Sequence, residues 1–174
     1  MAAIVQQGGV VFSLLGKSVF LFCLGFCTNP AFAAILTTSV PVSVEVISGC
    51  TITATPLVFG VYSPYAVIST KSISRLRILC TLNTPYNITL DQGNGISADT
   101  NLRTMSGPGT ATICYTLSQN PTCTINWGNT IGVDTVFGKG SGIPKYLTIY
   151  GEIPAQQNVS TGSYSDVVNI NIVF

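Results

Sequence analysis

The chain has 174 residues and carries little charge, with seven Lys and Arg, six Asp and Glu, no His and a formal net charge of +1. Because histidine is missing, Ser-His-Asp and Cys-His nucleophile arrangements and histidine-containing metal sites are excluded. The few basic residues form no patch that would attract nucleic acid, and the acidic residues are scattered beside turns. We therefore expect a protein that is not an enzyme, has no cofactor and binds no nucleic acid.

Residues 1–33 have the pattern of a secretion signal. Lys17 precedes an apolar run from Ser18 to Cys27, and Ala31-Phe32-Ala33 follows as a small-residue cleavage site. We expect cleavage after Ala33, which leaves one domain large enough to bury a core. An uncharged stretch, Met1 to Gly16, precedes Lys17, and the alternative for this region is an uncleaved membrane anchor.

A folded strand is expected directly after the cleavage site. Val40, Val42, Val44 and Val46 occupy even positions, and Pro41, Ser43 and Glu45 occupy the odd ones. This alternation with a period of two is typical of a β-strand with one apolar face. The periodicity alone does not decide whether the strand packs on its own domain or on another molecule.

Removal of the signal leaves four cysteines, at positions 50, 80, 114 and 123, in a chain directed to an oxidising compartment. Four cysteines allow three pairings. The turn cluster Ser118 to Pro121 lies between Cys114 and Cys123, so a bridge within one hairpin is the simplest choice. It leaves Cys50 to pair with Cys80, and closing a loop of about 30 residues would stabilise the fold by roughly 3 to 4 kcal/mol.

The rest of the chain reads as short strands separated by Gly, Pro, Asn and Ser, without helical periodicity. Apolar residues alternate with polar ones in five segments: Leu76 to Leu82, Tyr86 to Leu90, Ala111 to Leu117, Tyr146 to Tyr150 and Val168 to Phe174. Roughly seven strands with turns between them favour a two-sheet sandwich of immunoglobulin type. An amphipathic strand at each end of so uncharged a chain suggests edges that await a partner.

Several short motifs occur in a fixed order after the amino-terminal strand. They are Cys50-Thr51-Ile52, Leu57 to Tyr62, Cys80-Thr81, Tyr86 to Leu90, Arg103-Thr104-Met105, Trp127-Gly128, Leu147 to Gly151 with Ile153-Pro154, and Gly162 to Asp166. Together they resemble the spore coat protein U domain, which is shared by subunits of archaic chaperone-usher pili. The resemblance covers Cys50 to Phe174.

The resemblance implies an incomplete immunoglobulin-like sandwich that lacks its last strand. A periplasmic chaperone would fill the gap first, and the amino-terminal extension of the next subunit would replace it at an outer-membrane usher. Carried over to this chain, residues 34–48 are the donor extension and residues 49–174 the pilin domain. The acceptor groove would be lined partly by Val168, Ile170, Ile172 and Phe174. In the family a bridge equivalent to Cys50–Cys80 ties the first two strands, whereas Cys114 and Cys123 have no dependable counterpart.

We therefore expect a structural subunit of the shaft of an extracellular pilus, which joins copies of itself or other subunits and serves surface adhesion and biofilm formation. One alternative within the family is a spore or cell-surface coat protein. Another is a small outer-membrane β-barrel, which is disfavoured because the strands are shorter than the nine to eleven residues that such barrels require. The presence of chaperone and usher genes beside this gene would favour the pilus.

Overall fold

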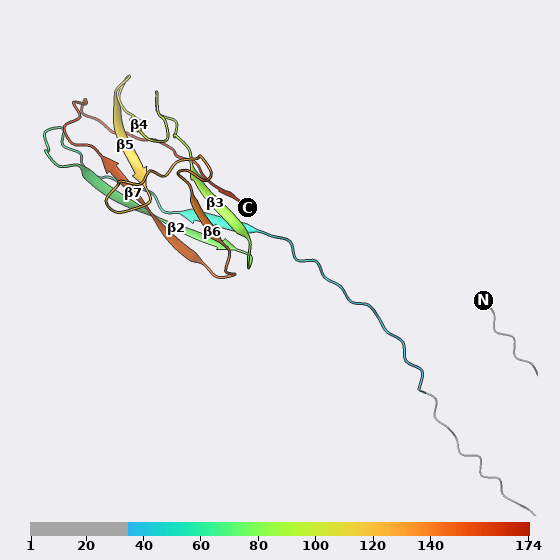
Figure 1. The fold of residues 1–174 in the computed structure, drawn as a ribbon. Coiled ribbons are helices and arrows are strands. Elements are labelled where there is room, and N and C mark those ends of the chain that lie inside the picture. The colour runs from blue at the N-terminus through green and yellow to red at the C-terminus, as the bar shows by residue number, and fades with distance from the viewer. Residues whose placement is uncertain (1–34) are drawn as a thin grey trace, which may run out of the picture. The chain divides into compact units, whose positions relative to one another are not determined.

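The computed structural model describes residues 35–174, and all regular elements in this part of the chain are β-strands. Val44–Phe174 forms one compact unit, and residues 35–43 lie outside it. Figure 1 shows the strands of this unit. They are β1 (Cys50–Ala54), β2 (Thr70–Cys80), β3 (Pro85–Leu90), β4 (Arg103–Ser106), β5 (Thr112–Ser118), β6 (Val136–Lys139), β7 (Lys145–Ile153) and β8 (Ile170–Val173).

The strands form two antiparallel sheets, which confirms the predicted immunoglobulin-like sandwich. The larger sheet has the order β1-β2-β7-β5-β4, and the smaller has the order β6-β3-β8. β1 and β8, the first and last strands, each lie at the edge of a sheet. Among residues 35–174 no helix is long and apolar enough to cross a membrane.

The core lies between the sheets and follows the alternation seen in the sequence. Leu76, Ile78 and Cys80 of β2 are buried, while Arg75, which precedes Leu76 on the same strand, faces solvent. On β5 the odd positions Ile113, Tyr115 and Leu117 point inward, as expected. The carboxy-terminal strand is shorter than predicted, because only Ile170–Val173 pairs with β3 and residues 166–169 belong to no strand.

The first predicted disulfide is confirmed and the second is not formed. Cys50 and Cys80 face each other in the β1–β2 register and are bonded. Cys114 and Cys123 are free thiols. The hairpin pairs Ser118 with Asn126, so Cys123 lies in the turn with a φ of 57°, whereas Cys114 lies further back along β5. The number of residues between two cysteines does not fix the register of the hairpin, and the spacing argument failed for that reason.

Arg103, the first residue of β4, is a fully buried cation with no exposed surface. Its guanidinium donates to four backbone carbonyl oxygens, at 2.8 Å to Asp91, 2.8 Å to Thr100, 3.2 Å to Leu90 and 2.9 Å to Trp127. Burial lowers its pKa, and the surrounding Tyr115, Asp91, Asp166 and Asp134 oppose that effect. One side chain thereby ties the end of β3 to the loop before β4, at Thr100, and to the connection between β5 and β6, at Trp127.

We expect Arg103→Ala to lower the free energy of unfolding by about 3 to 5 kcal/mol, because several buried carbonyls lose their donor at once. Arg75→Ala, which removes an exposed arginine, should change it by less than about 0.5 kcal/mol. Urea unfolding of the purified chain, followed by the fluorescence of buried Trp127, measures both. Equal midpoints for the two variants would contradict the role given to Arg103.

Candidate functional site

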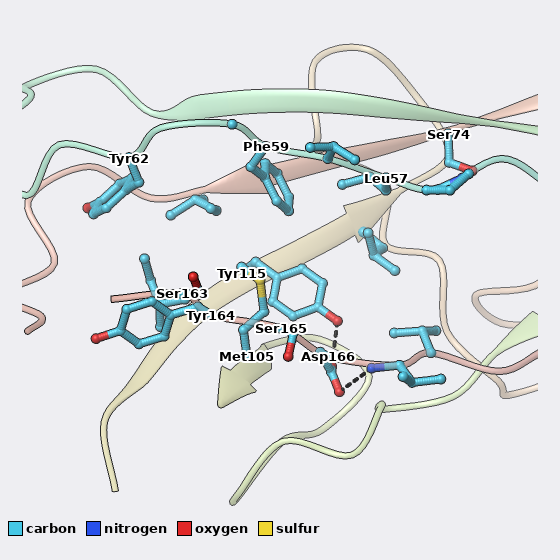
Figure 2. A pocket seen from close by; sticks show the side chains of 18 of the residues that line it. Leu57, Phe59, Tyr62, Ser74, Met105, Tyr115, Ser163, Tyr164, Ser165 and Asp166 are labelled. Carbon is cyan, nitrogen blue, oxygen red and sulfur yellow. Dashed lines mark hydrogen bonds between the residues drawn. The ribbon is translucent and has the colours of Figure 1, made fainter. Parts of the chain in front are cut away.

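An apolar cleft of about 880 Å³ opens between the two sheets. One wall is the segment that follows β1, residues 54–62, and the other is the segment that leads into β8, residues 159–170. Figure 2 shows Leu57, Phe59 and Tyr62 on one side and Tyr164 and Asp166 on the other. The floor consists of buried residues of the core, namely Leu90, Met105, Ile113, Tyr115, Leu117, Ile149 and Ile153.

The first wall is held at both ends by hydrogen bonds. Near its start, Thr55 N–H donates to the carbonyl of Arg75 (2.9 Å), and Ser72 donates through its hydroxyl to the carbonyl of Val58 (2.6 Å). At its far end the Tyr62 hydroxyl donates to the carbonyl of Pro154 (3.0 Å) and accepts from the Gln157 N–H (2.8 Å). These contacts position the wall although residues 55–62 belong to no strand.

The second wall is anchored through two carboxylates. Asp166 accepts hydrogen bonds from the N–H groups of Asn94 and Val167, both at 2.7 Å. Asp91 accepts from the N–H (2.9 Å) and the side-chain amide (2.6 Å) of Asn169. Burial raises the pKa of Asp91, but the hydrogen bonds from Asn169 and Gly93 outweigh it and the pKa is lowered below its ordinary value. The wall that leads into β8 is therefore fixed to the end of β3.

Tyr115 connects the floor of the cleft to both walls. Its hydroxyl donates to Asp166 Oδ2 at 2.6 Å, as the dashed line in Figure 2 shows. Its ring meets Phe59 edge to face, with centroids 6.1 Å apart. Burial, and then the hydrogen bond to Asp166, raise the pKa of Tyr115 well above its usual value, so the phenol stays protonated as the donor. On β7, Gly151 leaves room for the wall, because a Cβ there would come within 2.8 Å of Phe59.

Both walls present unpaired backbone. Within residues 35–174, the stretch from Leu57 to Tyr62 makes no backbone–backbone hydrogen bond, and β8 has a neighbouring strand, β3, on one side only. Strand edges of this kind are templates for another chain. The cleft therefore offers an apolar floor and free hydrogen-bonding groups at its rims.

The structure places the predicted groove residues in three environments. Val168 and Ile170 line the cleft. Ile172 packs against the core as Val168 and Ile170 do, but does not line the cleft. Phe174, 55% exposed, borders a separate hollow beside Val46 and Ile47. The sequence analysis did not predict the wall formed by residues 54–62. The motif Leu57 to Tyr62, which contributes to the resemblance to the family, was the signal that could have indicated it.

The predicted donor valines are exposed in the structure. Val40, Val42, Val44 and Val46 are 79, 92, 88 and 81% exposed, and no strand is assigned to residues 35–49. Where Gly49 meets β1, its N–H donates to the Thr81 hydroxyl (3.1 Å) and its carbonyl accepts from the Thr81 N–H (2.9 Å). These two hydrogen bonds attach Gly49 to the residue that follows β2.

A family model described as the Spore Coat Protein U domain matches residues 36–171 of this chain. The chain belongs to the Spore Coat Protein U domain family. Protein U of Myxococcus xanthus is 35% identical to it over 160 residues, which cover 84% of this chain and 89% of that protein. The match to the family begins within the segment that carries the exposed valines.

A chain in the crystal structure of the CsuC–CsuE chaperone and tip adhesion subunit pre-assembly complex, from archaic chaperone-usher Csu pili of Acinetobacter baumannii, has a similar fold. The TM-score is 0.54 and the sequence identity 22%, over 74% of this chain. The matched part corresponds to 40% of the length of the chain in that complex. The likeness shows the fold.

Tyr115→Phe is expected to lower the free energy of unfolding by about 1.5 to 3 kcal/mol, because a hydrogen bond to a charged group is lost. Tyr146→Phe is the matched control, since Tyr146 is 63% exposed, and it should be nearly neutral. Urea unfolding at neutral pH gives both values. An unchanged stability in Tyr115→Phe would mean that this hydrogen bond does not hold the cleft wall.

Proposed function

We propose that this protein is a structural subunit, of the shaft, of an extracellular archaic chaperone-usher pilus. The cleft of one copy receives the amino-terminal strand of the next, and repetition of this step builds a fibre that serves surface adhesion and biofilm formation. The protein acts as a building block and performs no chemical reaction.

The observation that carries the proposal is the presence, in one chain, of an open apolar cleft and an exposed segment in which valines alternate with other residues. The cleft has an apolar floor and unpaired backbone at both walls, and the valines from Val40 to Val46 are exposed. Small β-branched side chains also suit a cleft whose wall and floor already carry the large side chains of Phe59, Tyr115 and Met105.

Burial of this strand would supply a large stabilisation. Four valine side chains at roughly 1.5 to 3 kcal/mol each give on the order of 6 to 12 kcal/mol per junction as an upper bound. Hydrogen bonds along β8 and along residues 57–62 would add to this value. Such a junction would persist in mild detergent, which is what a fibre on a cell surface requires.

A free cleft in a secreted monomer is a hazard, because exposed edges and apolar floors promote aggregation. We infer that a periplasmic chaperone covers the cleft first, and that exchange for the next subunit's strand occurs at an outer-membrane usher. The fold shared with a chain of the CsuC–CsuE pre-assembly complex supports this order of partners. Residues 1–33 would direct the chain to the periplasm.

A second candidate is a structural protein of a spore or cell-surface coat. It is favoured by the family's description and by the 35% identity to Protein U of Myxococcus xanthus. The same strand exchange would then build a layer instead of a thin fibre. Immunogold labelling of intact cells distinguishes the two, since a pilus gives label along filaments and a coat gives label over the envelope.

Deletion of residues 34–48, with the signal kept, should leave a chain that is still recovered from the periplasm with its chaperone but forms no multimers, because the cleft is intact and the donor is missing. Val44→Asp should have nearly the same effect, since it would bury a charge among apolar side chains. Ser43→Asp changes the opposite face of the strand and should be milder.

The measurement is electrophoresis, without heating, of material sheared from cells, where strand-linked subunits run as a ladder. Long fibres from the deleted chain would show that residues 34–48 are not the donor. Equal damage from Ser43→Asp and Val44→Asp would show that the face with the valines is not the one that is buried.

A further inference from the structure

Both ends of the sandwich expose large apolar side chains. The Cys50 end is defined here by Ile47, Leu82, Ile143 and Phe174, which are 78, 68, 67 and 55% exposed. The distal end is defined by Val61, Tyr65, Val67 and Ile68, which are 97, 90, 78 and 76% exposed. Exposed apolar groups gathered in this way mark interaction surfaces.

The two ends lie at opposite poles of the compact unit. The register pairs Cys50 with Cys80 at one pole and Thr70 with Ile153 at the other. In Figure 1 the teal loop before β2 lies at the end of the sandwich opposite the carboxy-terminus. Residues 55–69 and 154–163 at the distal pole contain no charged residue. At the Cys50 pole residues 46–49 and 81–85 are uncharged, and Lys139 and Lys145 flank the segment that carries Ile143.

We propose that the distal end of one copy docks against the Cys50 end of the next copy, as a second contact beside the inserted strand. This proposal rests on the proposed function. Val61 also lines the cleft, so the distal surface is continuous with the cleft. A copy that covers the cleft would cover this surface as well.

The length of the connection decides which surface the second copy meets. Only Ile47, Ser48 and Gly49 separate Val46 from Cys50, and four extended steps reach at most about 14 Å. If the strand is buried up to Val46, the domain that follows it in the same copy lies directly against the acceptor. The Cys50 end of that domain is the part that faces the acceptor. The domain cannot swing away without withdrawing the strand.

The direction of insertion decides which end of the acceptor is touched. β8 runs from the distal pole toward the Cys50 pole, where the acceptor's own residues 44–49 leave the domain. An incoming strand parallel to β8 would deliver its domain to that occupied pole. A strand antiparallel to β8 delivers it to the distal pole, where the apolar Tyr65, Val67 and Ile68 meet the apolar Leu82 and Phe174 of the incoming copy.

The test is a cross-link between the two ends in assembled material. Tyr65→Cys and Leu82→Cys are combined in a chain in which Cys114 and Cys123 are replaced by Ser, and sheared material is treated with a short bis-maleimide. The expected result is a ladder of covalent multimers that survives heating in detergent. The matched control, Tyr65→Cys with Val133→Cys, uses a residue that is 80% exposed on the connection between β5 and β6, and it should run as a monomer after heating. Tyr65→Cys alone should also do so.

Monomers from the Tyr65→Cys, Leu82→Cys chain after heating, with its unheated ladder intact, would overturn the end-to-end contact and leave strand insertion standing. Covalent multimers at equal yield from the Val133→Cys control would overturn it as well, since the contact would then be unspecific. If the unaltered chain gives no ladder before heating, the proposed function fails and the end-to-end contact fails with it.

Discussion

Backbone N–H and C=O groups at a buried strand edge need hydrogen-bond partners. In the cleft between residues 54–62 and 159–170, the strands of this sandwich do not provide those partners. β8 pairs on one side only, and residues 57–62 pair on neither. Beneath them lies a floor of core side chains that includes Leu90 and Ile149. One extended segment with an apolar face would satisfy the free backbone groups and cover the apolar floor at the same time.

The cleft keeps its form because its walls are attached to the rest of the fold by specific hydrogen bonds. Tyr62 fixes one wall to the segment after β7, and Asp166 and Asp91 fix the other to the end of β3. Arg103 holds that same end of β3 through the carbonyls of Leu90 and Asp91. Because these groups are already ordered, an inserted strand would lose mainly its own conformational entropy, and preorganisation of this kind favours tight association.

Alternation of apolar and polar residues was sufficient to predict β2, β3 and β5 and the burial of Leu76, Ile88 and Tyr115, since a two-residue period reports directly which face is covered. In β8 the same pattern marks Ile170 and Ile172, which are only half-buried, and Phe174 beyond its end is exposed. The wall of residues 55–62 escaped prediction because it pairs with no strand and is placed by side-chain contacts to residues far along the chain. The burial of Arg103 was not predicted for a related reason. Its hydrogen-bond partners are backbone carbonyls, which the identity of the residues does not reveal. The free state of Cys114 and Cys123 depends on a hairpin register that spacing does not encode.

The most direct test of the account is to identify what occupies the cleft in assembled material. A photo-activated cross-linking residue at Val168, on the wall of the cleft, captures its neighbour on irradiation, and heating in detergent followed by peptide mass spectrometry identifies it. The account predicts covalent multimers in which the peptide containing Val168 is joined to the peptide containing Val40 to Val46. A cross-link to that same segment found only at the mass of a single chain would contradict it, because the strand would then complete its own domain.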